Sequence, residues 1–186
     1  MEPTLRSVAF CWGIAGVLLL LIFAVYRLAP MALDLTEHKL SVVQWLALGF
    51  SIIYMAYAEG YRGFHKAFAP RVVARAIYLK SRPEPLHIIF APLYCMGYIH
   101  ATRRRQVFSI GLTLVIICFI LIARTLSQPW RGILDAGVVV GLSLGIISIC
   151  YFLIIAKINP SALDISAEVP EDSAVPKSKS EGIKAS

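Results

Sequence analysis

The chain has 186 residues, of which 58% are hydrophobic, and a formal net charge of +7 at pH 7. Soluble domains are about 45–50% apolar and seldom contain apolar runs of about 20 residues, whereas this chain contains several and has a mean hydropathy of +0.73. The composition excludes a soluble globular domain and predicts an all-α, polytopic membrane helical bundle.

Four runs that are almost free of charge predict four transmembrane helices within a membrane domain that covers residues 1–158. A helix rises 1.5 Å per residue, so each run is long enough to cross roughly 30 Å of hydrocarbon. The first run is not read as a signal peptide, because its apolar core exceeds about 7–15 residues and no small-x-small cleavage site follows it. The predicted spans are 8–28, 41–58, 107–126 and 134–156.

The interval 59–105 between the second and third spans contains nine of the eighteen Lys and Arg residues. Short loops rich in Lys and Arg stay on the cytoplasmic side of a membrane. We therefore expect a multi-pass protein of the cell (inner) membrane with both termini and this whole interval in the cytoplasm.

Three polar residues, Glu59, Arg62 and His65, follow the second predicted span directly. One interpretation is an interfacial helix end with an aromatic belt, in which Glu59 and Arg62 pair three residues apart. The other is a polar cluster that binds a headgroup or moves a proton.

Residues 70–82 have the pattern of an amphipathic helix that begins at Pro70 and has a basic face opposite an apolar one. Such a helix suits the surface of an anionic leaflet, where each basic residue contributes about 1 kcal/mol. Six arginines are the expected contacts to anionic lipid headgroups: Arg71, Arg75, Arg82, Arg103, Arg104 and Arg105.

Segment 86–101 is apolar enough to suggest a fifth span, but as a straight helix it reaches only about 24 Å. If it crossed, the basic residues before and after it would lie on opposite sides of the membrane, against the positive-inside rule. We expect a re-entrant or interfacial segment shielded by neighbouring helices. Five transmembrane helices remain the alternative.

Polar residues also flank the turn that leads into the last span. Arg131 and Asp135 are four apart and can pair on one helix face, near a helix start that favours an anion. This arrangement is typical of a structural start and anchor. Alternatively, Arg124 and Asp135 face each other across the hairpin as an ion or proton site.

The last predicted span carries Gly137, Gly141 and Gly145 at a spacing of four residues. Without side chains on that face, another helix backbone can approach closely, and van der Waals contact then drives association in lipid. The pattern predicts a helix-packing face, and it leaves open whether the partner helix belongs to the same chain.

Residues 159–186 combine low hydrophobicity with Pro, Ser and charged residues, which predicts a disordered cytoplasmic tail. The chain contains no motif for a catalytic centre, a cofactor or a metal ion, so we expect no cofactor and no metal. Nucleic acid is not an expected partner, because no stacking platform or recognition fold accompanies the arginines.

Three functions fit these features. The first is a non-catalytic packing or assembly partner in an anionic membrane, bound to a second copy or to a larger membrane complex. The second is a small transporter or ion/proton-coupled carrier that uses Glu59, Arg124 and Asp135. The third is a lipid-modifying membrane enzyme with His65, His87 or His100 as its base. Interior positions of Glu59 and Asp135 would favour the second over the first.

Overall fold

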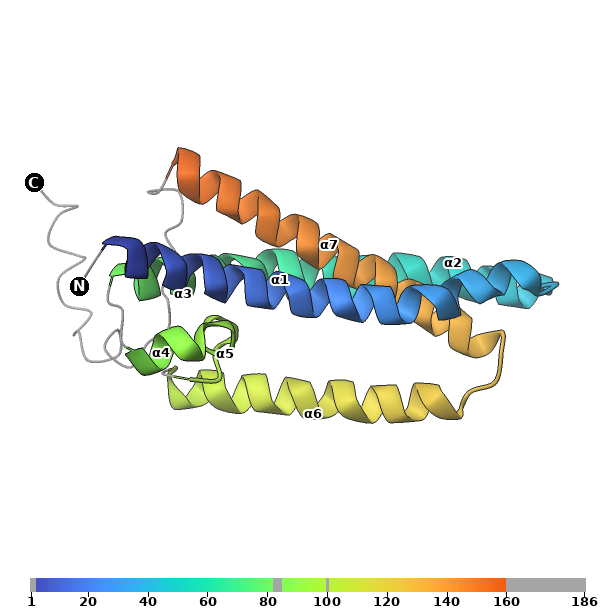
Figure 1. The fold of residues 1–186 in the computed structure, drawn as a ribbon. Coiled ribbons are helices and arrows are strands. Elements are labelled where there is room, and N and C mark those ends of the chain that lie inside the picture. Colours follow the sequence, from blue (N-terminus) through green and yellow to red (C-terminus); the bar gives the residue numbers. More distant parts are fainter. Residues whose placement is uncertain (1–2, 82–84, 100, 160–186) are drawn as a thin grey trace, which may run out of the picture.

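The structure, a computed structural model, describes residues 3–81, 85–99 and 101–159, and every regular element in these ranges is helical. Long helices run along one axis and two short helices lie at one end (Figure 1). The predicted disordered tail lies outside the described residues apart from Asn159.

Helix α1 (Pro3–Leu33) contains the first predicted span and continues beyond it, past Pro30, into a short 3₁₀ turn, η1 (Asp34–Glu37). Its 31 residues extend about 46 Å at 1.5 Å per residue, more than the hydrocarbon thickness of a bilayer. The ends of α1 therefore reach the polar regions on both sides if its centre lies in hydrocarbon.

The next helix is continuous from Val42 to Ser81 and consists of α2 (Val42–Met55), η2 (Ala56–Phe68) and α3 (Ala69–Ser81). Ser41 and Gln44 form a capping box at its start. The middle part, η2, is a π-helix, in which bonds step five residues, as from Ala69 N–H to Phe64 O.

This continuity corrects two boundaries expected from the sequence. The helix does not stop near residue 58, and Pro70 does not begin a separate surface helix, because the chain is already helical on both sides of it. Polar residues are tolerated here since η2 and α3 pack against other helices of the chain, which leaves α3 with seven buried residues.

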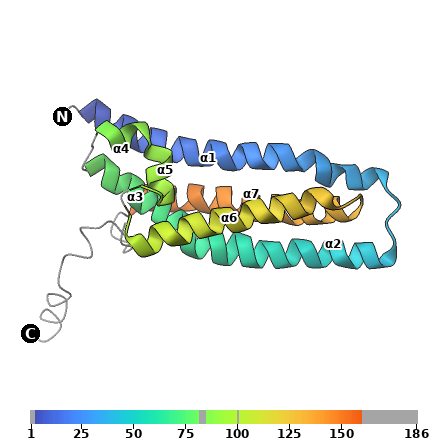
Figure 2. The same ribbon diagram turned by 90° about the horizontal axis from the view of Figure 1, so that it is seen from below.

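Two short helices follow, α4 (Pro85–Ile89) and α5 (Ala91–Met96), before α6 (Arg103–Thr125) and α7 (Trp130–Ile158). Gly97 ends α5 with a φ of 87°, a left-handed conformation that favours glycine. Figures 1 and 2 both show α4 and α5 beside the beginning of α1 and near the beginning of α6. Segment 86–101 therefore forms short helices and turns rather than one straight helix.

The long helices alternate in direction: α1 and α6 run one way, and α2–α3 and α7 return (Figures 1 and 2). The core lies between α1, α3, α5 and α7 and includes Ala9, Val17, Val73, Tyr94 and Ile149. Helix α6 contributes little to it, and most of its apolar side chains are exposed.

Three helical segments are long and apolar enough to cross a membrane: Arg6–Glu37, Val42–Ser81 and Trp130–Ile158. The apolar part of α6, Ser109–Thr125, coincides with the third predicted span but is shorter than these three. The chain is thus an all-helical protein, within its described residues, with three membrane-length helices.

Candidate functional site

The glycine face of α7 lies directly against α2 and η2. A Cβ atom built on Gly141 would lie 2.7 Å from Glu59 Oε2, and one on Gly145 would lie 2.7 Å from the Phe64 ring. A Cβ on Gly137 would overlap Ser51. Distances below 3.0 Å leave no room for a side chain, so the face is filled by a helix of the same chain.

Polar side chains follow the same contact between α7 and the α2–η2 helix. We call them the polar seam: Ser51, Glu59, His65 and Ser148. The Ser51 hydroxyl donates to Ile133 O at 3.0 Å, and His65 Nδ1 lies 3.3 Å from Ser148 Oγ. Since both helices run in the same direction, the seam extends along most of α7.

Glu59 lies opposite the central part of α7 rather than at a helix end. Its carboxylate is half-buried against Gly141, which is eleven residues, or about 17 Å, from the start of a helix about 43 Å long. The polar cluster expected around it is only partly assembled. Arg62 is exposed, and no ion pair joins it to Glu59 within the described ranges, since a π-helix does not preserve the three-residue alignment of an α-helix.

His65 lies opposite an interior residue of α7 rather than at an end of that helix. Its partner Ser148 is ten residues from the end of α7, about 15 Å along the helix. The imidazole ring stacks on Tyr61, with centroids 5.8 Å apart, and touches Phe152 at 5.2 Å. One ring nitrogen therefore has a polar partner while the ring faces are covered by aromatic groups.

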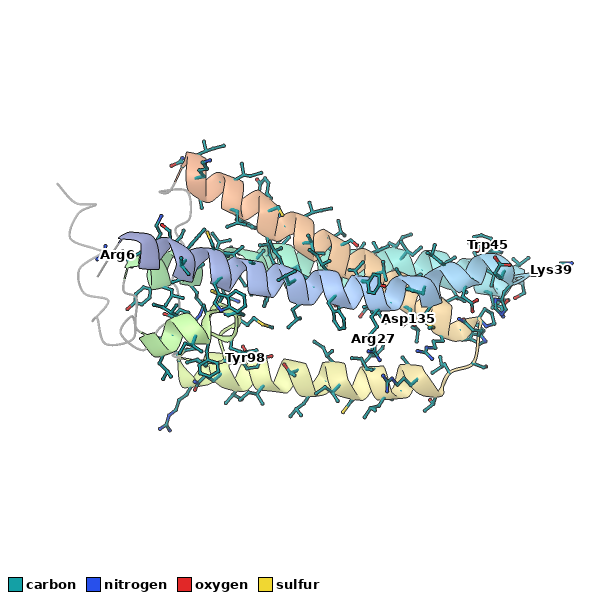
Figure 3. All side chains as sticks on the ribbon, viewed as in Figure 1. Arg6, Arg27, Lys39, Trp45, Tyr98 and Asp135 are labelled. Atoms are coloured by element: carbon teal, nitrogen blue, oxygen red, sulfur yellow. The ribbon has the colours of Figure 1, made fainter. Side chains whose placement is uncertain are left out.

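Asp135 lies near the start of α7 but outside the seam, because it is two residues before Gly137 and therefore about 160° away around the helix. Its side chain is only 7% exposed, and Oδ2 lies 3.6 Å from Arg131 Nε, the pairing predicted from their spacing. In the part of the chain that the structure describes, Oδ2 has no hydrogen-bond partner. Arg124 is exposed at the end of α6, and the described residues record no contact between it and Asp135. Figure 3 places Asp135 in the half of the bundle that holds Lys39 and Trp45, away from Arg6 and Tyr98.

Arg75 is inside the protein, which corrects its expected place on a lipid-facing surface. The residue is 2% exposed, and its guanidinium donates to Tyr94 O at 2.6 Å and to Ile99 O at 2.7 Å. It also lies over the Tyr94 ring, 4.5 Å from the centroid. Tyr94 O lies at the end of α5 and also accepts the Gly97 N–H at 3.0 Å, and Ile99 O lies in the turn that follows.

The structure describes the side chains of only two of the other arginines expected to bind lipid. Arg71 is half-exposed and Arg103 is exposed. Arg82 and the side chains of Arg104 and Arg105 lie outside the described residues. Arg71 and Arg75 therefore do not form one common outward face of α3.

Small residues of α1 receive α5, as glycines of α7 receive η2. A Cβ on Gly13 would lie 2.8 Å from Cys95 Sγ, and one on Gly16 would overlap Pro92. Burial raises the pKa of the Cys95 thiol to about 12, although the Arg75 charge opposes this, so the thiol stays protonated and unreactive.

Helix α6 is attached to the turn after α5 by polar contacts at its first half. Ser109 Oγ donates to Met96 O at 3.3 Å, and Gln106 Nε2 donates to Tyr98 O at 3.1 Å. Tyr98 and Thr113 share a further hydrogen bond between their hydroxyl groups. These contacts join segment 86–101 to α6, as Arg75 joins it to α3.

Comparison of the chain with protein-family models, with curated proteins and with solved structures found no match to any of them.

Proposed function

We propose that the chain is a small ion/proton-coupled carrier in which the polar seam passes a proton between the two sides of a membrane. The observation that supports this most is the carboxylate of Glu59, which lies between two helices and opposite the centre of α7. Acidic residues within membrane helices are costly to keep and are typical of proton relays and ion pathways.

Groups that accept and donate protons lie on both sides of Glu59 along the bundle. His65 and Ser148 are hydrogen-bonded toward one end, and Asp135 lies toward the other with an oxygen beside Arg131. Imidazole and carboxyl groups exchange protons readily. A relay through Asp135, Glu59 and His65 is the mechanism that we propose.

The carrier has four membrane spans in this proposal, with α6 as the third, and segment 86–101 as a re-entrant element. Both termini and the basic residues from Arg71 to Arg105 face the cytoplasm of the cell (inner) membrane, where anionic headgroups attract them, whereas Glu59 and His65 lie within the membrane. The seam then extends from an outer end at Ser51 to an inner end beyond His65.

A second candidate, an assembly partner of a larger membrane complex or of a second copy, is supported by α6. Its apolar side chains are exposed around the helix, as at Val107 (71%), Val115 (66%) and Ile122 (61%). The glycine face, by contrast, favours this candidate less, because it already packs within the chain.

The carrier proposal is tested by proton flux into liposomes that contain the purified protein. A potassium gradient with valinomycin supplies the driving force, and a dye inside reports pH. Replacing Glu59→Gln should slow the flux by about ten-fold or more, equivalent to raising its barrier by about 1.4 kcal/mol.

Glu37→Gln is the matched control, because Glu37 is an exposed acid in η1, outside the seam. It should conduct like the wild type. The proposal fails if liposomes with the wild-type protein acidify no faster than empty ones, or if Glu59→Gln and Glu37→Gln conduct equally.

A further inference from the structure

The spacing of contacts along the seam differs between its two helices. The glycines of α7 at 137, 141 and 145 are four residues apart. The residues that lie against the last two of them, Glu59 and Phe64, are five apart. In an α-helix, residues five apart point in directions about 140° apart, because each residue turns the helix by about 100°.

The π-helical geometry of η2 resolves this mismatch. Hydrogen bonds that step five residues widen the turn, so that residues five apart lie on the same face. Glu59 and Phe64 can therefore both contact α7. If the turn between them became α-helical, one of the two would have to leave the glycine face.

A π-helix of thirteen residues is unusual, because most π-helical segments are single turns. Two glycines lie inside it. Gly60 packs closely on Leu144, but a Cβ on Gly63 would meet only Ala58 O, at 3.4 Å. At Gly63 itself, no side chain of another helix lies close enough to resist a change of turn.

The two ends of η2 are held unequally. On the α3 side, Arg75, Val73 and Leu79 are buried among α1, α5 and α7. On the α2 side, Ser51 is the only buried residue between Val42 and Met55, where it contacts Gly137 and Ile133 O of α7, and side chains such as Ile53 are exposed. A change of turn in η2 would therefore rotate α2 and Glu59, while α3 stays in place.

We infer that η2 is a conformational switch, in which exchange of one π turn for an α turn rotates α2 and moves the Glu59 carboxylate off Gly141. This rests on the proposed function, in which such a movement gives Glu59 access to each end of the seam in alternation. In the structure the Glu59 side chain packs against Gly141 of α7.

Distances between spin labels on α2 and α7 test the switch without measuring transport. Labels are placed at Ile53→Cys and Ile147→Cys, both exposed positions, in the full-length protein with its four cysteines replaced by alanine. The protein in liposomes should show two distances that differ by about 10 Å, the width of a helix with its side chains.

Deletion of Gly63 brings Glu59 and Phe64 to a spacing of four, which matches the glycines of α7 in a plain α-helix. The deletion should leave a single distance. Gly63→Ala, which keeps the length of η2, should retain both. Labels at Ile77 and Ile147 should give one distance throughout, because α3 is held in place.

A single Ile53–Ile147 distance in the protein without the deletion would overturn the switch, and this measurement decides even if the deletion variant fails to fold. Two distances that persist after deletion of Gly63 would also overturn it. Loss of flux in Glu59→Gln together with a single distance would support the carrier proposal and overturn the switch. Two distances in a protein that shows no proton flux would support the switch and overturn the carrier proposal.

Discussion

Arg75 is a charged residue in a nearly inaccessible position, and the carbonyl groups around it explain how the fold accommodates it. The α5 helix has only six residues, and the described residues between it and Arg103, 97–99 and 101–102, are not helical. Backbone groups of this kind need partners if they lie at membrane depth. The fork of donors in a guanidinium reaches two carbonyls at once, as an ammonium cannot.

We predict that Arg75→Met releases segment 86–101 from α3. The change leaves Ile99 O without its bond from Arg75, at a cost of about 1–3 kcal/mol for a buried group that loses its bond, whereas Tyr94 O keeps its bond from Gly97 N–H. Maleimide labelling of a cysteine at position 99 should become faster, and thermal stability should fall.

Arg62→Met is the control, because Arg62 is exposed, and it should change neither measurement. Arg75→Lys should lie between the wild type and Arg75→Met. Unchanged labelling in Arg75→Met would show that the contacts of α5 with Gly13 and Gly16 are enough to hold the segment.

The helices pack closely through glycines, as where η2 lies on α7 and α5 lies on α1. We predict that Gly141→Leu destabilises the protein by about 1–3 kcal/mol, the usual cost of inserting a side chain into a packed site, because Glu59 occupies the space. Thermal unfolding in mild detergent measures this. Insertion should persist, since the helix becomes more apolar.

Two other glycines make matched controls. A Cβ on Gly49 or on Gly111 would meet nothing within 4 Å. Gly49→Leu and Gly111→Leu should therefore unfold at the temperature of the wild type or above it. If Gly141→Leu behaved like them, close packing at this face would have no energetic role.

Spacing and hydropathy predict the helices more reliably than the positions of their charged residues. The four-residue spacing of Gly137 and Gly141 identifies one side of a contact, but its partner depends on the three-dimensional path of η2. Hydropathy falls at Glu59, which reads as the end of a span, because composition does not reveal that α7 covers this acid. Arg75 is similar: the apolar residues around it, Val73 and Ala76, were the available signal that it lies inside.

Arg71, in the first turn of α3, and Arg103, at the start of α6, remain candidates for lipid contact. We predict that Arg71→Gln combined with Arg103→Gln lowers the amount of copurified anionic lipid, at about 1 kcal/mol for each charge near an anionic leaflet. Arg75→Gln should lower stability instead, because its side chain is buried. Binding measured at two salt concentrations should weaken with salt; equal lipid in all variants would contradict the assignment.

At the scale of the molecule, the last turns of α3 and the helices α4 and α5 share one end of the bundle. Figure 1 shows the N-terminal end of α1 at this end too, with the turn between η1 and α2 at the other. The interval 59–105 contains nine basic residues. We expect the alternation of α1, α2–α3, α6 and α7 to place those at this end on one side of a membrane.

This arrangement leads to a prediction about topology. Reporter fusions after Lys80 and after Gln106 should both report the cytoplasm, and a fusion after Lys39, in the turn that precedes α2, should report the opposite side. The physical reason is length: α4 and α5 have five and six residues, about 17 Å of helix in total, against roughly 30 Å of hydrocarbon. Labelling of single cysteines at positions 80 and 39 by an impermeant maleimide provides an independent check. Opposite sides for the fusions at Lys80 and Gln106 would mean that segment 86–101 crosses the membrane, and the chain would then have five spans.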